Sequence, residues 1–265
     1  MRHSLAVFLL LTLVACSSDP AKEEMKNASA DEIYAKAQEQ MQDNNYEKAI
    51  KQFEMLQSRY PYGRYAQQAQ MEIAYAYYKH SEPAPAIAAL DHFVKMYPMS
   101  THLDYVYYLK GLINFNENIN SLFGTMFKQD PADRDPAALR DSFDSFKELV
   151  TRFPDSKYTP DARYRMQYLL NTLATSEIHV ADYYLRRGAY VAAANRAKGV
   201  LIDFPQTPQT LDALQILVQA YDAMGMKDLR DDTKRILALN ETKIGFRPLV
   251  KESPLNPTPW WKFWD

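Results

Sequence analysis

The clearest pattern of apolar and polar positions in the chain lies in residues 45–78. Ala49, Phe53 and Leu56 follow one another at spacings of four and three residues, which places them on one side of a helix. Pro61 ends this helix, because proline has no backbone N–H with which to continue the hydrogen-bond ladder. One unit of the pattern is therefore a small residue, a bulky residue four positions later and a proline eight positions after that.

The same unit occurs three more times along the chain, and an aromatic residue precedes each proline. This arrangement is typical of the tetratricopeptide repeat, a helical hairpin of ~34 residues in which small residues let the two helices approach each other. We therefore predict an all-α fold, a right-handed α-solenoid of about five tetratricopeptide hairpins. The four units are Ala49, Phe53 and Pro61; Ala86, Leu90 and Pro98; Ser142, Phe146 and Pro154; and Ala193, Ala197 and Pro205.

The composition fits this fold and narrows the function. The chain has 265 residues, of which 47% are hydrophobic and only seven are glycine, as expected for helices that share a core. The net charge of -2 gives no general attraction to nucleic acid. No histidine or cysteine pair has the spacing of a metal site, and no phosphate-binding loop or catalytic serine motif occurs. We therefore expect no cofactor, no metal and no enzymatic activity.

The N-terminal segment predicts secretion and lipid anchoring. Residues 1–15 place Arg2 before an apolar run that is too short to span a bilayer, which is typical of a signal peptide. They end at Cys16, the one cysteine of the chain, as in the bacterial lipobox. We expect Cys16 to carry a diacylglycerol and an N-acyl lipid such as palmitate, and residues 16–30 to form a flexible tether. The alternative is an ordinary signal peptide followed by an incidental cysteine.

The residue after Cys16 bears on localisation. It is Ser17 and not aspartate, which by analogy with bacterial sorting rules predicts the outer membrane. A lipid-anchored chain of this kind is expected to face the periplasm.

The rest of the chain divides into repeats and a tail. Residues 31–159 are expected to hold repeats 1–3, with an insertion at about 118–135. Residues 160–240 hold repeats 4–5 and begin with a long helix that ends near Gly188. Residues 241–265 form a tail, rich in proline and tryptophan, that we expect to be extended. Tryptophan favours membrane interfaces and binding hot spots, but the tail could equally fold back onto the last repeat.

Several longer stretches resemble one known family. They are DEIYAKAQ, RYPYGRYAQQAQ with IAYAYYK, LDYVYYLKGL, DRDP, SKYTPDA and VADYYLRRGAYVAAANR. Together with the lipobox and the repeats, these stretches resemble the BamD family, the repeat lipoproteins of the bacterial outer-membrane β-barrel assembly (BAM) machinery. The resemblance covers residues 31–240.

This resemblance implies a non-enzymatic adaptor. Members bind the periplasmic region of BamA, contact BamC and other BAM lipoproteins, and receive the C-terminal targeting signals of unfolded outer-membrane proteins for insertion into the outer membrane. The implied partners are therefore proteins and, through the lipid anchor, the outer membrane, but not nucleic acid. The alternative is a repeat lipoprotein that serves as a scaffold in cell-envelope organisation, in contact with peptidoglycan or in division or competence.

Candidate signal-binding residues lie in the second hairpin. Tyr60, in the RYP motif, matches a family position that the resemblance associates with signal binding. Met71, Tyr75 and Tyr78 are offset from the core-facing side of their helix, so they are candidates for the concave face of the solenoid. The alternative for Tyr60 is a structural role as a wedge between hairpins, and the alternative for the other three is packing against the neighbouring repeat.

Candidate partner-binding residues lie in the fourth hairpin. Arg196, in the stretch ANR, matches a family position linked to the BamA interface, and we assign Arg187 to the same interface. Arginine can bind a carboxylate through two N–H groups, so an acidic partner is expected. The alternative for Arg196 is a solvated helix face.

Overall fold

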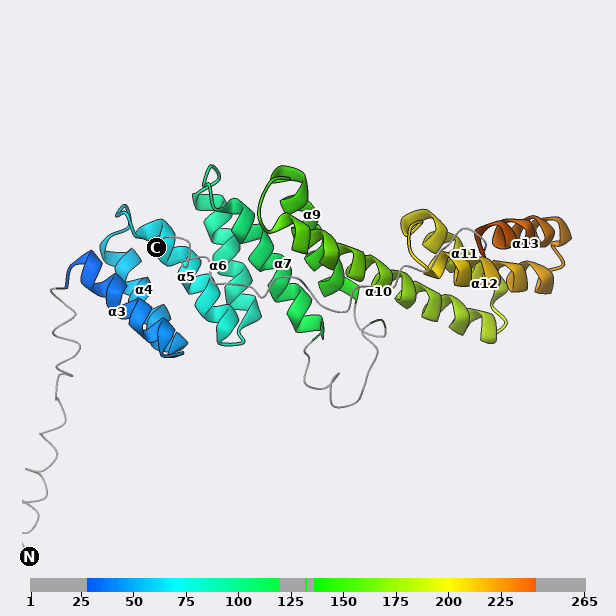
Figure 1. Cartoon of the computed structure of the whole chain (residues 1–265). Helices are drawn as coiled ribbons and strands as arrows, with labels where there is room; N and C mark the ends of the chain where they lie inside the picture. The colour runs from blue at the N-terminus through cyan, green and yellow to red at the C-terminus, as the bar shows by residue number, and fades with distance from the viewer. Residues whose placement is uncertain (1–27, 120–131, 133–135, 242–265) are drawn as a thin grey trace, which may run out of the picture. The chain divides into compact units, whose positions relative to one another are not determined.

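The computed structural model describes residues 28–119, 132 and 136–241 (Figure 1). Over these residues the chain forms ten α-helices and no strand, which confirms the predicted all-α class. Within α3–α5 and within α7–α13, successive helices pack against each other, as expected for a helical repeat. The helices are α3 (Ala30–Gln42), α4 (Tyr46–Arg59), α5 (Ala66–Lys79), α6 (Pro83–Met96), α7 (Leu103–Ile119), α9 (Pro136–Arg152), α10 (Thr159–Arg186), α11 (Tyr190–Asp203), α12 (Gln209–Ala223) and α13 (Lys227–Glu241).

The pattern of contacts divides the chain after Ala89 into an N-terminal and a C-terminal unit, which we describe separately. In the N-terminal unit, α3 packs against α4, and α4 packs against α5. Ala37, Ala49, Phe53 and Leu56 form part of the core between these helices and are all 0% exposed. The small alanines on facing helices thus let the first hairpin close around Phe53.

In the C-terminal unit, α7 packs against α9, α9 against α10, and α10 against both α11 and α12. The need for a small residue is clear at Gly111 of α7, where an added Cβ would lie 2.5 Å from the Phe146 ring of α9. Ser142 of α9 lies at the same crossing and donates a hydrogen bond to the Gly111 carbonyl at 2.9 Å. Ser142, the predicted small residue of its unit, therefore lies at a close contact between two helices.

The turns that follow α4, α6, α9 and α11 share one geometry. In each, the aromatic residue before the proline donates its backbone N–H to the last turn of the helix and accepts from the residue three positions later. For Tyr60 these bonds run to the Leu56 carbonyl at 2.8 Å and from the Gly63 N–H at 2.9 Å. The aromatic–proline pair is thus the helix stop that the sequence predicts.

The helix α10 is 28 residues long and matches the long helix expected from the sequence. It is followed by Gly188, whose φ of 74° lies in the left-handed region that favours glycine. Because α10 contacts α9, α11 and α12, the third and fourth hairpins belong to one unit. The division by contacts falls after Ala89, and the boundary between the repeats at residues 159 and 160 stays a prediction.

Several predicted segments lie outside the described residues. They are the signal peptide, Cys16, nearly all of the tether and of the 118–135 insertion, and the tail beyond Glu241. Among the helices that the structure describes, none combines the length and the hydropathy needed to cross a membrane.

Candidate binding surfaces

The turn around Tyr60 is the most exposed aromatic feature of the N-terminal unit. Tyr60 is 36% exposed, and Tyr62, two residues later, is 100% exposed. The Tyr60 hydroxyl donates a hydrogen bond to the Ala28 carbonyl at 3.2 Å, so the start of the described chain lies beside this turn. Tyr60 is therefore accessible, as a role in signal binding requires.

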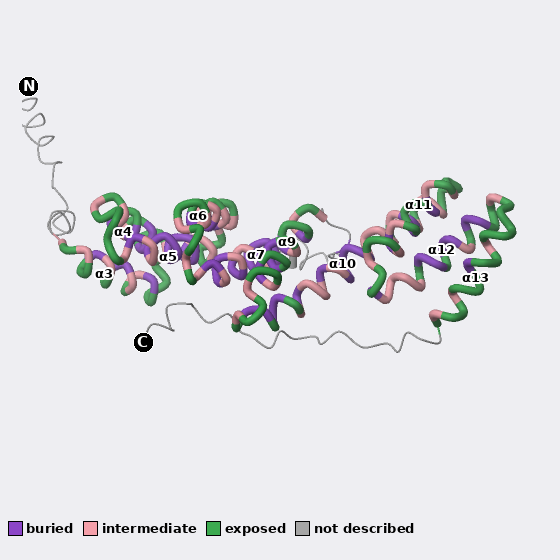
Figure 2. Tube along the Cα trace, turned by 90° about the horizontal axis from the view of Figure 1, so that it is seen from above, coloured by how far each residue is buried: buried purple, intermediate pink, exposed green. Residues whose placement is uncertain are grey.

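The other three candidates on α5 differ in exposure. Met71 and Tyr75 are only 1% and 8% exposed, whereas Tyr78 is half-buried. The Tyr75 ring lies 6.1 Å from the Tyr78 ring, and burial raises the pKa of the Tyr75 hydroxyl. Met71 and Tyr75 therefore do not line an open face as expected, because buried residues occur on almost every side of α5 (Figure 2).

A buried acidic residue on α5 was missed by the sequence analysis. Glu72 is 0% exposed, and its Oε1 accepts a hydrogen bond from Nε2 of Gln38 on α3 at 2.5 Å. The same Nε2 contacts the Tyr34 hydroxyl at 2.9 Å. Burial raises the pKa of the Glu72 carboxyl to about 8. The signal in the sequence was one glutamate within the otherwise apolar run MEIAYAYY.

An aromatic stack covers the start of α3. The rings of Tyr34 and Tyr65 are stacked, with their centroids 4.5 Å apart, and the Arg64 guanidinium lies 4.5 Å above the Tyr65 ring. Asp31 accepts hydrogen bonds from the Tyr65 hydroxyl at 2.6 Å and from Arg64. These two donors lower the pKa of the Asp31 carboxyl. The stack gives this end of the unit a rigid surface that presents both aromatic and charged groups.

Arg196, on α11 in the C-terminal unit, already contacts a carboxylate of its own chain. Its Nη1 donates to Oε2 of Glu177 on α10 at 3.0 Å, and Arg140 of α9 lies 3.8 Å from the other Glu177 oxygen. The Glu177 side chain is 23% exposed, whereas that of Arg196 is 49% exposed. The three residues join α9, α10 and α11. The predicted preference of Arg196 for an acidic group is thus met within the chain, and half of its side chain still faces solvent.

Arg187 lies at the end of α10, in a different setting. It is exposed, and its guanidinium lies 5.7 Å from the centroid of the Tyr183 ring, which is itself 50% exposed. This is cation–π geometry on an accessible surface. Arg187 and Tyr183 therefore form an aromatic and cationic pair that is open to a partner.

A buried polar network joins α7 and α10. Asp161 is 0% exposed and accepts hydrogen bonds from the Tyr108 hydroxyl at 2.7 Å and from Nε of Arg165 at 2.6 Å. The Arg165 guanidinium also lies 4.7 Å from the Phe115 ring centroid. Because these groups are covered by the helices around them, their role is to fix the two helices and not to meet a substrate.

The described residues hold no group of three or more histidine, cysteine or acidic side chains that could bind a metal ion. Helical hairpins that present aromatic and charged side chains on accessible surfaces define a helical-repeat binding protein. Such a protein acts through contacts with other molecules.

Comparison with known sequences identifies the family. The sequence model of the outer membrane lipoprotein family YfiO matches residues 26–236. The chain belongs to this family.

Its relatives share nearly the whole chain. Proteins named "Outer membrane protein assembly factor BamD" are similar to it: those of Neisseria meningitidis serogroup A and Neisseria gonorrhoeae are each 40% identical over 264 residues, 98% of this chain and 98% of the relative. The Vibrio cholerae protein of the same name is 35% identical over 239 residues, which cover 90% of this chain and 98% of the relative. The role of an assembly factor is non-enzymatic, and this chain is likewise not an enzyme.

Proposed function

We propose that the chain is a lipid-anchored, non-enzymatic adaptor of the outer-membrane β-barrel assembly machinery. The observation that carries this proposal is the match to assembly factors over 98% of both chains. Stacked helical hairpins suit such a role, because each hairpin offers its own binding surface.

The anchor would be Cys16. A diacylglycerol and an N-acyl lipid on its side chain and amino group provide the two or more acyl chains that stable membrane attachment needs. Residues 16–30 would then tether the hairpins on the periplasmic side of the outer membrane. Replacing Cys16 with alanine is expected to release the chain from the membrane fraction.

The N-terminal unit would receive the C-terminal targeting signals of unfolded outer-membrane proteins. Tyr60 and Tyr78 are the candidates for direct contact, since both are partly exposed. A tyrosine offers rigid contact area and a hydroxyl for the main chain of an extended peptide. Met71 and Tyr75 would support this surface from beneath, because both are buried.

The C-terminal unit would dock the periplasmic region of BamA through Arg196 and Arg187, while BamC and other BAM lipoproteins occupy further surfaces. What supports this assignment is the half-exposed Arg196 side chain and the exposed Arg187, which are both suited to an acidic partner surface.

A co-purification experiment tests the proposal. The membrane-bound chain is isolated in detergent, and recovery of a large barrel protein with periplasmic domains is measured. We expect Arg196→Glu to reduce this recovery at least about tenfold, because it places a like charge against the partner. Arg163→Glu, at an exposed position of α10, is the matched control. Recovery of peptidoglycan fragments in place of a barrel protein would favour the cell-envelope scaffold and refute the adaptor.

A further inference from the structure

The last described helix, α13, is covered far less than the helices before it. Its one buried residue is Thr233. The core cluster of the final hairpins draws its described residues from α10, α11, α12 and the adjoining turns, with none from α13. Figure 2 shows the tube of α13 as mostly exposed. The helix therefore rests on α12 without joining the apolar core.

Large apolar side chains nevertheless follow one side of this helix. Met226, just before α13, and Leu229 and Ile236 within it are 45%, 47% and 49% exposed. Together with Thr233 they are spaced by three, four and three residues, so they form one stripe that includes the buried contact. About half of the surface of Met226, Leu229 and Ile236 remains in water, which is unfavourable for apolar groups.

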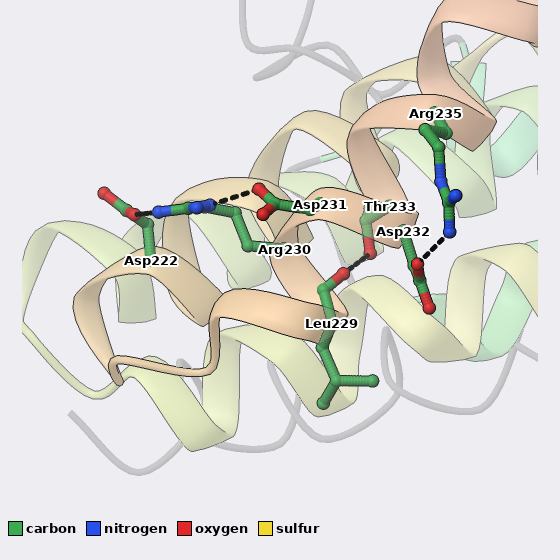
Figure 3. A network of polar contacts seen from close by, with 7 residues as sticks. All are labelled: Asp222, Leu229, Arg230, Asp231, Asp232, Thr233 and Arg235. Atoms are coloured by element: carbon green, nitrogen blue, oxygen red, sulfur yellow. Dashed lines mark hydrogen bonds and ion pairs between the residues drawn. The ribbon is translucent and has the colours of Figure 1, made fainter.

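Ion pairs occupy the side of α13 next to this stripe. Arg230 donates from Nη1 to Asp222 and from Nε to Asp231, both at 2.7 Å. These hydrogen bonds lower the pKa of both carboxyl groups. Figure 3 shows Arg230 extended between its two partners, with the Leu229 side chain pointing away from them. The arginine on this side is thus paired with one carboxylate of α13 and one of α12, whereas the apolar stripe is left half covered.

We propose that the chain's own tail, residues 242–265, binds the Met226–Leu229–Ile236 stripe and caps the last hairpin. The end repeat of a helical array needs cover, because it has a neighbouring repeat on one side only to bury its apolar side chains. The tail begins at the residue after α13 and carries Ile244, Phe246, Leu249, Val250 and Leu255 before its aromatic end. The tail is thus a source of apolar side chains that is covalently joined to the end of α13.

Length and tethering both permit this contact. The 24 residues of the tail span up to about 80 Å when extended, whereas the 15 residues of α13 are ~22 Å long. A covalently attached segment acts at an effective concentration on the order of millimolar. An untethered partner would need to reach that concentration to compete with weak apolar contacts.

The three tryptophans of the chain, Trp260, Trp261 and Trp264, all lie in the tail, so tryptophan fluorescence reports on this segment alone. The test uses the full chain with Cys16→Ser, which carries no acyl group. We expect blue-shifted emission and low quenching by acrylamide. The double variant Leu229→Ser/Ile236→Ser should shift the emission to the red and raise the quenching constant roughly twofold, because the indoles return to water.

A matched control uses exposed apolar residues of another helix. Val191 and Ile202 of α11 are 64% and 75% exposed, so Val191→Ser/Ile202→Ser removes similar surface away from the stripe. This variant should keep the emission and quenching of the parent chain. Equal quenching in the parent and the stripe variant, with helical circular dichroism retained, would overturn the proposal.

Two further results would also overturn it by identifying another occupant. A blue shift that grows with protein concentration would assign the stripe to a second copy of the chain. A blue shift that occurs only when phosphatidylglycerol vesicles are added would assign the tryptophans to a lipid surface. The proposal is independent of the adaptor function, because its readout requires neither a partner nor a membrane.

Discussion

Two fully buried carboxyl groups, Glu72 in the N-terminal unit and Asp161 in the C-terminal unit, have different surroundings. Asp161 forms an ion pair with Arg165 at 2.6 Å and accepts from the Tyr108 hydroxyl. Glu72 accepts from one amide, that of Gln38, and its Oε2 has no hydrogen-bond partner among the described residues. The cost of burying the Asp161 carboxylate is thus offset by the cationic Arg165. The cost of burying Glu72 is instead avoided by its raised pKa, which favours the neutral, protonated form.

The largest expected loss of stability comes from removing Arg165, the cation that pairs with Asp161. Arg165→Leu removes the guanidinium that donates to the buried Asp161 carboxylate at 2.6 Å, and we expect a loss of about 3–5 kcal/mol in the free energy of unfolding. Urea unfolding followed by circular dichroism measures the loss. Arg163→Leu on the same helix is the control, since Arg163 is exposed and its loss should change stability by less than about 0.5 kcal/mol. Equal effects would mean that burial does not distinguish the two arginines.

A second prediction concerns how Glu72 makes the stability of the folded chain depend on pH. The pKa of Glu72 is raised from 4.5 to about 8 in the folded chain. The stability that Glu72 contributes is therefore fully present below pH ~4.5 and is lost as the pH rises through ~8. Glu72→Gln should remove this dependence and stabilise the chain at pH 9 by on the order of 5 kcal/mol, with little change at pH 4.

Thermal unfolding of the Glu72→Gln variant across pH 4 to 9 checks this prediction. Glu39→Gln, at an exposed position of α3, is the control that should leave the pH profile unchanged. An unchanged profile for Glu72→Gln would contradict the assignment of a raised pKa.

A smaller effect is expected from removing the amide donor of Glu72. Gln38→Leu deletes the hydrogen bond at 2.5 Å that favours the charged carboxylate. The pKa of Glu72 should therefore rise further, and the free energy of unfolding at neutral pH should fall by about 1 kcal/mol. The carboxyl carbon of Glu72, followed by NMR during a pH titration, reports the pKa directly. A downward shift of the midpoint would contradict this account.

The smallest effect is expected at an exposed carboxylate. Asp31 pairs with Arg64, but the side chains of both residues are more than 60% exposed. Solvent screens such a pair, so Arg64→Ala should cause no measurable change in the unfolding temperature in 0.15 M salt. A clear drop in the unfolding temperature would show that the Tyr65 stack, and not the charge pair, depends on Arg64.

The sequence predicted the helices and their pairing because periodicity and volume are local properties. Ser142, for example, was predicted as the small residue of its unit, and it lies where α9 crosses α7. It did not predict that Met71 and Tyr75 are buried, because periodicity tells which residues share a side of a helix but not how many neighbours cover that side. Glu72 and Glu177 were missed for a related reason, since their partners lie on other helices.

The contact between Arg196 and Glu177 has a consequence for how any acidic molecule would bind there. An acidic ligand must displace the Glu177 carboxylate from Arg196, so the net gain in binding free energy is the small difference between two similar ion pairs. An exchange of this kind favours quick release over permanent capture. It also makes the contact sensitive to ionic strength, since half of the arginine side chain is open to salt.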